Sequence, residues 1–378
     1  MNANCDPRSL KEKKICVLIS APSLASSVNV SGISAVVSEL KQALGDEVHY
    51  THLVLGAPQT GKWYLRKLAS LLNILKGMLK AITEKYDILH SNTALMTRSI
   101  YRDLPFVLAA RISGKAVILH FHGGLFLETK PTGLVRVALK FLIGMSEKIV
   151  FLSQTELELF TQHTFVPSRK SISIYNSVRI PKEARTPAAD DDSLRVLFAG
   201  RLVSEKGVDL VLKAANRCYP ASVHFTIYGD GPIKREIETE ASVNRALTFG
   251  GVFAHADWPE ILKNYDILVL PSKVPFEGMP MIVLEAMSLG LVPIATPYGS
   301  IPELLGRRER GLLIAPNDVE MLVAAISELA SSPETLATMG NRSRIFAKEK
   351  FDSSVTSRAF LSLYNDLSSG KNLRGNVE

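Results

Sequence analysis

Residues 198–214 read FAGRLVSEKGVDLVLKA, which is an apolar strand, a glycine turn, a short charged loop and an apolar-periodic helix. The same strand-and-helix alternation recurs along the chain. Earlier apolar runs are KICVLIS (14–20), DILHSN (87–92), AVILHFH (116–122) and KIVFLS (148–153), and later ones are HFTIYGDG (224–231), ALTFGG (246–251), DILVLPS (266–272) and LVPIATP (291–297). Such alternation predicts an α/β fold with mostly parallel sheets covered by helices on both faces, and two series predict two doubly wound, Rossmann-like domains.

The segment PKEARTPAADDDS (181–193) separates the two series and lacks apolar periodicity, which is typical of a linker. We therefore expect a first domain over residues 1–185 and a second over 186–352. The helical stretch SSVTSRAFLSLYNDL (353–367) follows the second domain's helices. We expect this C-terminal helix to return to the first domain, which would then include residues 353–378.

The composition is that of a globular protein: of 378 residues, 46% are hydrophobic and 21% charged, which excludes an intrinsically disordered chain. The three cysteines have no CxxC spacing, so neither a disulfide framework nor a zinc site is indicated. The N-terminal residues lack the apolar core of a secretory signal, and no later apolar run is long enough to cross a bilayer. A cytoplasmic location is the expectation.

The net charge of +7 is unevenly distributed. Residues 1–185 hold 24 Lys and Arg against 13 Asp and Glu, a balance of +11, whereas the remainder holds 20 against 24, a balance of −4. A basic first half favours an anionic partner there, such as a membrane surface or a phosphorylated substrate. Nucleic acid is disfavoured as a partner because no binding module or aromatic-interleaved basic run is present.

Two cations flank the glycine turn of the opening stretch. Arg201 follows the strand end, and Lys206 stands just before the helix, beside Gly207. Open α/β sheets bind ligands at the carboxyl ends of their strands, where helix N-termini attract phosphate. Arg201 and Lys206 are therefore candidate ligands of a diphosphate. Taken alone, the pair is somewhat better explained as two solvated cations on a loop.

Two glutamates occur eight residues apart in PSKVPFEGMPMIVLEAMSLGLVPIATPYG (271–299). We expect a helix from about Pro280 to just before Gly290, with Glu277 in the entry loop and Glu285 more than one turn inside. Carboxylates accept hydrogen bonds from vicinal hydroxyls, so one could bind a sugar and the other a ribose. The alternative is that both only complement a helix dipole.

The stretch LHFHGGLF ends another strand with His120 and His122, followed by Gly123 and Gly124. Alternation along a strand turns both histidines the same way, and glycines allow a ligand to approach the backbone closely. No third ligand stands at a zinc-like spacing. In VNVSGISAVVSEL (28–40), the backbone N–H groups around Gly32 enter a helix and could meet an anion.

From residue 14 to 366 the order and content of these motifs resemble the family 4 glycosyltransferases, retaining enzymes with the two-domain GT-B fold. The matching stretches are SGISAVVSEL, HFHGG, IYNSV, FAGRLVSEKGVDLVLKA, YGDGP and PSKVPFEGMPMIVLEAMSLGLVPIATPYGSIPELL. The resemblance implies two domains that face each other across a cleft, with a nucleotide-sugar donor bound mainly to the second.

The resemblance also implies roles for individual residues. It makes Arg201 and Lys206 the diphosphate clamp, Glu285 the ribose ligand and His122 the active-site histidine. Glu277 would contact the donor sugar, as would the backbone of the next three residues, Gly278, Met279 and Pro280. Gly32 would belong to the loop beneath the phosphates. Two positions depart from the usual family pattern: Ser31 replaces a glycine, and Met279 replaces a phenylalanine.

The implied reaction transfers a sugar from a nucleoside diphosphate sugar to an acceptor hydroxyl with retention of configuration, without a metal or other cofactor. The implied acceptor is a glycan or lipid-linked glycan in surface polysaccharide assembly. Two alternatives are a sugar-nucleotide epimerase of the same architecture and a non-catalytic nucleotide-sensing or glycan-assembly subunit. The retained clamp, spaced glutamates and His122 argue against both.

Two cationic helical stretches, WYLRKLASLLNILKGMLKAI (63–82) and GLVRVALKFLIGMSEK (133–148), could lie on the anionic inner face of a membrane. The alternative is that both bury their apolar side on their own sheet and turn their lysines to water.

Overall fold

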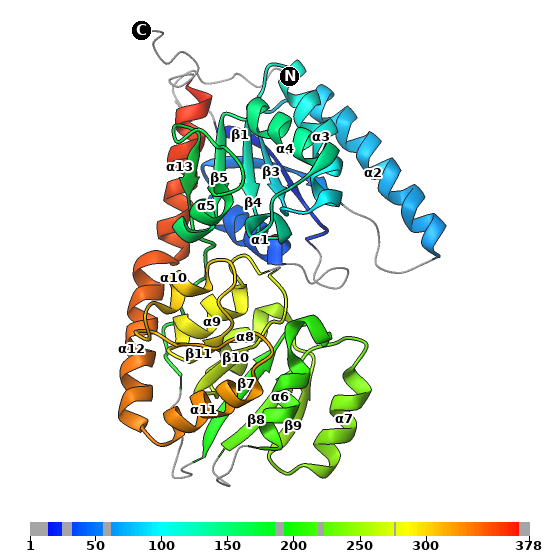
Figure 1. Ribbon diagram of the computed structural model, residues 1–378. Helices are drawn as coiled ribbons and strands as arrows, with labels where there is room; N and C mark the ends of the chain where they lie inside the picture. Colours follow the sequence, from blue (N-terminus) through cyan, green and yellow to red (C-terminus); the bar gives the residue numbers. More distant parts are fainter. Residues whose placement is uncertain are drawn as a thin grey trace, which may run out of the picture.

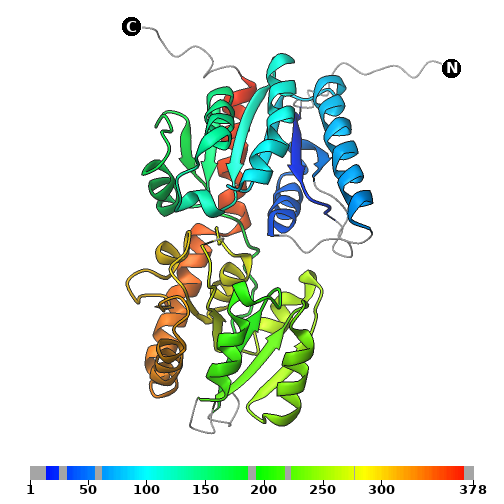
Figure 2. The same cartoon turned by 45° about the vertical axis from the view of Figure 1, so that its right-hand side comes forward.

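The computed structural model describes residues 14–24, 32–55, 62–185, 193–217, 223–275 and 277–369. These residues form two α/β domains stacked end to end, each built on one parallel sheet (Figures 1 and 2). The predicted fold class, two doubly wound Rossmann-like domains, is confirmed.

The sheet of the first domain has the strand order β2-β1-β3-β4-β5-β6, and every pairing in it is parallel. Its strands are β1 (Ile15–Ala21), β2 (Val48–Val54), β3 (Ile88–Thr93), β4 (Ala116–Phe121), β5 (Lys148–Phe151) and β6 (Ser171–Ser173). Its helices are α1 (Gly32–Ala43), α2 (Trp63–Thr83), α3 (Thr97–Ile112), α4 (Gly133–Met145) and α5 (Gln154–Thr161), with a 3₁₀ turn η1 (Leu125–Leu127).

Alternate residues of each strand serve opposite faces of this sheet. On β1, Leu18 packs under α2, α3 and α4, whereas Val17 and Ile19 pack under α1 and the C-terminal helix. Because both faces are covered, strands such as β1 and β5 are mostly apolar, which is why they appear in the sequence as nearly continuous apolar runs.

The second sheet has the order β12-β11-β10-β7-β8-β9, also parallel. Its strands are β7 (Leu194–Ala199), β8 (Val223–Tyr228), β9 (Leu247–Gly251), β10 (Ile267–Leu270), β11 (Val292–Ala295) and β12 (Leu312–Leu313). The helices are α6 (Val208–Ala215), α7 (Lys234–Val243), α8 (Trp258–Leu262), α9 (Met281–Leu289), α10 (Ile301–Leu305), α11 (Val319–Ala330) and α12 (Pro333–Lys350), with 3₁₀ turns η2 (Ser204–Lys206) and η3 (His255–Asp257).

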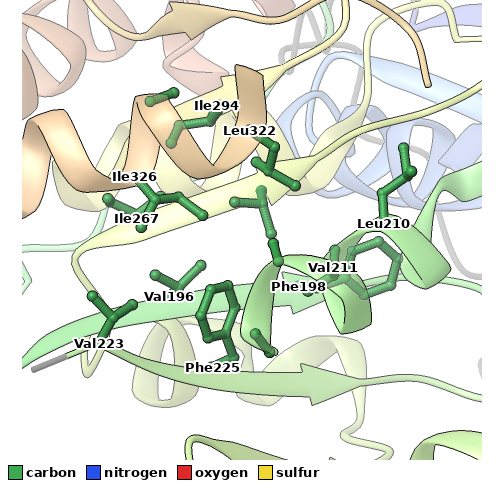
Figure 3. Close-up of a cluster of buried hydrophobic side chains, with 14 of the residues drawn as sticks. Val196, Phe198, Leu210, Val211, Val223, Phe225, Ile267, Ile294, Leu322 and Ile326 are labelled. Atoms are coloured by element: carbon green, nitrogen blue, oxygen red, sulfur yellow. The ribbon is translucent and has the colours of Figure 1, made fainter. Parts of the chain in front are cut away.

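The core of the second domain interleaves strand and helix side chains (Figure 3). Val196 of β7 lies near Phe225 of β8, and Phe198 of β7 lies beside Val211 of α6, in a cluster that also includes Leu322 and Ile326 of α11. These apolar contacts fix β7 in the middle of the sheet, so the loop after β7 begins at the centre of the sheet's carboxyl edge.

The last helix, α13 (Ser353–Ser368), crosses back to the first domain, as expected (Figures 1 and 2). Phe360 and Tyr364 of α13 pack with α1 against the first sheet. A β-bridge between Val178 and Asp352 lies where the chain crosses. The domain boundary at residues 185 and 186 stays a prediction, because residues 186–192 lie outside the described part of the chain.

Helix α2 lies on the outside of the first domain (Figure 1). Its leucines are exposed to solvent, so for α2 the alternative in which the apolar side is buried on the sheet is wrong. For α4 that alternative is confirmed, because α4 buries its main apolar face in the core of the first domain. Among the helices in the described ranges, none combines the length and apolarity needed to cross a membrane.

Candidate active site

The carboxyl ends of β4 and β10, one from each domain, meet at a glycine contact. A Cβ built on Gly278 would lie 2.8 Å from the backbone nitrogen of Gly123, and one built on Gly123 would lie 2.5 Å from the Cα of Gly278. Two backbones this close admit no side chain between them. His122 of the first domain precedes Gly123, and Glu277 of the second domain precedes Gly278. The glycine contact therefore brings these two residues close together.

The loop after β7 carries the two predicted diphosphate ligands. Gly207 has φ 73° and precedes α6, and a Cβ there would lie 1.9 Å from the carbonyl oxygen of Pro271, so only glycine fits. Arg201 is exposed, and its guanidinium has no hydrogen-bond or ion-pair partner within the described ranges. Its five N–H donors are thus available to an incoming anion.

Lys206 is already engaged with the second predicted site. Its Nζ lies 2.5 Å from Oε1 of Glu277, and the Oγ of Ser272 donates to the same oxygen at 2.7 Å. The Glu277 side chain is mostly buried. The predicted diphosphate ligand Lys206 and the predicted sugar ligand Glu277 are therefore joined directly, with Oε1 of Glu277 held by two protein donors.

Helix α9 begins after Pro280 and ends at Gly290, which has φ 87°, and this confirms the helix expected from the sequence. Met279 is buried before it, and its carbonyl accepts a hydrogen bond from Nδ2 of Asn176 at 3.1 Å. Asn176 follows β6 of the first domain, so this bond also spans the two domains.

Glu285, inside α9, is buried and accepts a hydrogen bond from Nε2 of His255 at 2.8 Å. That hydrogen bond, together with the negative charges of Glu285 and Glu39, raises the pKa of His255. Glu39 belongs to α1 of the first domain, and burial raises its own pKa. The predicted ribose ligand, Glu285, is therefore hydrogen-bonded to a histidine whose pKa is raised by carboxylates from both domains.

His122 is fixed by Asn92 at the end of β3. Nδ2 of Asn92 donates to the carbonyl of Ser20 at 2.7 Å, so its Oδ1 is the atom 2.7 Å from Nε2 of His122. An amide oxygen can only accept, so Nε2 carries the proton and Nδ1 carries the lone pair. Burial lowers the pKa of His122 to about 3, so the ring is neutral at physiological pH.

Two further buried histidines lie beneath His122. The ring of His120 lies 4.1 Å from that of His122, and its Nδ1 is 3.1 Å from Nε2 of His90. Nδ1 of His90 is 2.7 Å from the hydroxyl of Tyr364 on α13. Burial lowers the pKa of both His90 and His120. Helix α13 thus contacts, through Tyr364 and His90, the histidine that packs against His122.

Gly32 is the first residue of α1, and a Cβ added there would meet no atom within 4 Å. The preceding residues of the expected loop, up to Ser31, lie outside the described residues. The phosphate-loop role of Gly32 stays a prediction.

Comparisons with known proteins agree with this geometry. Residues 180–346 match the family model described as glycosyl transferases group 1. That match spans most of the second domain and less than half of the chain. A UDP-Gal:alpha-D-GlcNAc-diphosphoundecaprenol alpha-1,3-galactosyltransferase of Escherichia coli is 28% identical over 288 residues, 69% of this chain and 70% of its own. A putative colanic acid biosynthesis glycosyltransferase, WcaL of Escherichia coli, is 27% identical over 199 residues, 50% of this chain and 48% of its own.

The structure of HepE from Anabaena in complex with UDP-glucose superimposes with a TM-score of 0.70 at 17% identity, covering 93% of this chain and all of HepE. That likeness shows a shared GT-B fold. These findings confirm the resemblance drawn from the motifs, are consistent with the family 4 type, and support a glycosyltransferase of group 1.

Sequence analysis missed four residues that hold the site together: Ser272, His255, Asn92 and Asn176. Ser272 lies in the stretch 271–299, and Asn176 lies in IYNSV. Neither motif indicates that the Ser272 hydroxyl contacts Glu277 or that the Asn176 amide contacts Met279. His255 and Asn92 act through contacts about 30 residues away in sequence. No local pattern predicts such a contact.

Proposed function

We propose that this chain is a retaining glycosyltransferase. It moves a sugar from a nucleoside diphosphate sugar to a hydroxyl of a glycan or lipid-linked glycan, in surface polysaccharide assembly. The observation that carries the proposal is the Lys206–Glu277 pair, which links the cationic loop after β7 to the entry loop of α9, directly across from His122.

The nucleotide-sugar donor would extend from Glu285, past Arg201 and Lys206, to Glu277. Glu285 would accept hydrogen bonds from the ribose hydroxyls, and Arg201 and Lys206 would hold the diphosphate. Glu277 and the backbone of Gly278, Met279 and Pro280 would hold the sugar. Because Oε1 of Glu277 already has two protein donors, its Oε2 is the oxygen left to accept from sugar hydroxyls.

The barrier to transfer is departure of the diphosphate, with negative charge growing on it and positive charge on the sugar. Arg201 and Lys206 would stabilise the growing negative charge at the cleft, where each well-placed donor contributes on the order of 3 kcal/mol. The two cations would take the place of a divalent metal, so we propose that the reaction needs none.

His122 would lie beside the sugar being transferred. Its neutral ring presents Nδ1 as an acceptor, which can orient a sugar hydroxyl without adding a positive charge next to the oxocarbenium-like centre. Neither His122 nor Glu277 is assigned as a covalent nucleophile, and we propose a front-face route in which the leaving phosphate assists the incoming hydroxyl.

The acceptor would bind against the basic first domain. The name of the Escherichia coli galactosyltransferase specifies a diphosphoundecaprenol-linked sugar, and WcaL is named for colanic acid biosynthesis. These names support a lipid-linked or polysaccharide acceptor here. The cytoplasmic location expected from the sequence stays a prediction.

The test is a transfer assay in EDTA with UDP-, GDP- and ADP-sugars and undecaprenyl-diphosphate-linked acceptors, with the product anomer assigned by NMR. The proposal expects one donor to give a glycosylated acceptor of the donor's own anomeric configuration. An inverted product would exclude the retaining mechanism, and activity restored only by added Mg²⁺ would exclude metal independence. Conversion of the donor to an epimer without acceptor would identify an epimerase instead.

A further inference from the structure

Helix α2 carries an apolar stripe that faces solvent along its whole length. The side chains recur every three or four residues and are each between 45% and 61% exposed: Tyr64, Leu65, Leu68, Leu71, Leu72, Leu75, Leu79 and Ile82. At about 100° per residue they fall on one side of the helix, which is about 30 Å long. Eight such residues in one continuous stripe exceed the scattered apolar residues usual on a protein surface.

The face of α2 that packs on the domain carries fewer large apolar residues than the exposed stripe, with Ile74 and Met78 against the core of the first domain. Gly77 and Ala81 are buried, and a Cβ on Gly77 would lie 2.4 Å from the ring of Phe106 on α3. The helix is therefore held to the domain by a small set of contacts, and the side with more large apolar residues is the one left outside. This orientation is the reverse of that of an ordinary surface helix.

The charges of α2 are all positive. Its sequence, WYLRKLASLLNILKGMLKAIT, contains no Asp or Glu. Lys76 and Lys80 are exposed and lie on one flank of the stripe. Beyond α3, helix α4 also lacks acidic residues and exposes Leu134, Val137 and Phe141, although it buries its main apolar face in the core of the first domain.

We propose that α2 docks lengthwise on an anionic lipid bilayer, with its apolar stripe in the headgroup region and its lysines against lipid phosphates. An apolar stripe bordered by lysines is what an interfacial helix requires. A second copy of the chain fits this face less well, because two α2 helices would bring cations against cations with no carboxylate on either to pair them.

The N-terminal end of α2 lies toward the second domain (Figures 1 and 2). Docking would therefore bring the mouth of the interdomain region close to the lipid headgroups, where a lipid-linked acceptor would present its sugar. The delivery of a lipid-linked acceptor rests on the proposed function, whereas the docking on lipid depends only on α2.

The structure supplies its own reporter for a binding test. Trp63 begins α2 and is 68% exposed, and the chain's other tryptophan, Trp258, is buried. Vesicles of phosphatidylcholine with 30% phosphatidylglycerol, and of phosphatidylcholine alone, would be titrated into the full-length protein. We expect a blue shift of Trp63 emission and co-sedimentation with the anionic vesicles, and much weaker binding to the neutral ones.

Two variants separate the apolar and charged contributions. Leu68→Gln/Leu75→Gln should weaken binding to the anionic vesicles by about tenfold or more, because two stripe residues lose their burial in lipid. Lys76→Glu/Lys80→Glu should lose about tenfold or more and remove the preference for anionic lipid. Their matched controls lie on exposed positions of the second domain: Val243→Gln/Ile345→Gln and Lys213→Glu/Lys348→Glu. Both controls should bind like the wild type.

Each outcome decides the proposal. Loss of binding in the α2 variants alone, with the controls unchanged, supports it. Absence of wild-type binding, or binding equally strong in the α2 variants, overturns it. Self-association that the α2 variants abolish, without vesicle binding, would assign the stripe to a second copy instead. Thermal stabilisation by UDP, measured on the same variants, reports the donor site separately, so failure of the docking and failure of the proposed function are distinguishable.

Discussion

At the scale of single residues, the tautomer of His122 depends on one side chain, Asn92. The amide oxygen of Asn92 fixes the proton on Nε2, and its amide nitrogen is in turn fixed by the carbonyl of Ser20. Asn92 is therefore a positioning residue: it keeps His122 neutral and directed, without itself reaching the donor in the proposed complex.

Asn92→Asp should raise the pKa of His122, because a carboxylate beside Nε2 favours the protonated ring. Activity would then fall as the pH drops through the new pKa, whereas the wild type, with a His122 pKa of about 3, should show no such loss above pH 5. The ring pKa by NMR and the pH dependence of kcat/KM measure this. Asn264→Asp, at an exposed asparagine, is the control. An unchanged pH profile in Asn92→Asp would show that Asn92 has only a structural role.

The contribution of the Lys206–Glu277 ion pair to stability can be measured separately from its contribution to nucleotide binding. Lys206→Met should lower the free energy of unfolding by about 1–3 kcal/mol, because it leaves the largely buried Glu277 carboxylate without its cation. Adding Glu277→Gln should restore most of that loss by removing the charge. Chemical denaturation of both variants measures it.

Nucleotide binding should not be restored in the same double variant, since Lys206 contacts the diphosphate in the proposed complex. Arg308→Met, which removes an exposed pair with Glu328, is the control and should change stability by less than about 1 kcal/mol. Full UDP binding by Lys206→Met/Glu277→Gln would remove Lys206 from the clamp.

At the scale of elements, the loops that follow β4 and β10 meet at the close backbone contact between Gly123 and Gly278. Gly278→Ala should lower both the melting temperature and the activity, because its Cβ would lie 2.8 Å from a backbone atom that has no room to move aside. Gly144→Ala in α4 is the control, because no atom lies within 4 Å of its Cβ, and it should be neutral or stabilising by up to about 1 kcal/mol. Wild-type stability and activity in Gly278→Ala would mean that the domains are not closed at this point.

Helix α5 contains a buried carboxyl that should make stability depend on pH. Glu156 is fully buried, both of its oxygens lack a hydrogen-bond partner within the described ranges, and burial raises its pKa to about 8. Between about pH 4.5 and 8 the folded chain holds a proton that the unfolded chain has lost. Stability should therefore fall as the pH rises through this window.

Glu156→Met should flatten that pH dependence and stabilise the protein at pH 8 by about 1–3 kcal/mol, because no buried polar group is left without a partner. Denaturation between pH 5 and 8.5 measures the slope. The exposed Glu158→Met, two residues along the same helix, should keep the wild-type slope. Equal slopes in the wild type and Glu156→Met would show that this carboxyl ionises normally in the folded chain.

Glu156 also lies beside a joint between the domains. Its neighbour Thr155 donates to Oε2 of Glu303 on α10 through its backbone nitrogen at 2.8 Å and its hydroxyl at 2.9 Å, and Tyr175 donates to Oε1. Ionisation of Glu156 would add a second negative charge next to this bound carboxylate. The alkaline loss of stability is thus expected to loosen the α5–α10 joint first.

At the scale of the whole molecule, the fold follows from the sequence because most strands buried on both faces are rich in apolar residues, and their alternation with helices permits few topologies. The helix after Pro280 was predictable to within a residue, since proline and glycine mark its ends. The helix return to the first domain was expected, although the contact of Tyr364 with His90 was not.

Other features of the site and of the surface depend on contacts between residues far apart in the sequence, which no local pattern reveals. The Lys206–Glu277 pair joins residues 71 positions apart, and the orientation of α2 reverses what its amphipathic pattern suggests. Periodicity shows that a helix has an apolar side. The side that faces the domain places Gly77 against Phe106 and Ile74 and Met78 against the core, and no helical repeat reveals these contacts.

The most direct test of the central claim, a donor site built on Arg201, is thermal denaturation in EDTA with UDP, GDP, ADP and CMP in turn. It would be run on the wild type, Arg201→Ala, and Arg235→Ala as an exposed arginine control on α7. We predict that one nucleoside diphosphate stabilises the wild type and Arg235→Ala, by roughly 2.7 kcal/mol at a hundred times its dissociation constant, and stabilises Arg201→Ala much less. Stabilisation of all three proteins to the same degree, or of none of them by any nucleotide, would contradict the account.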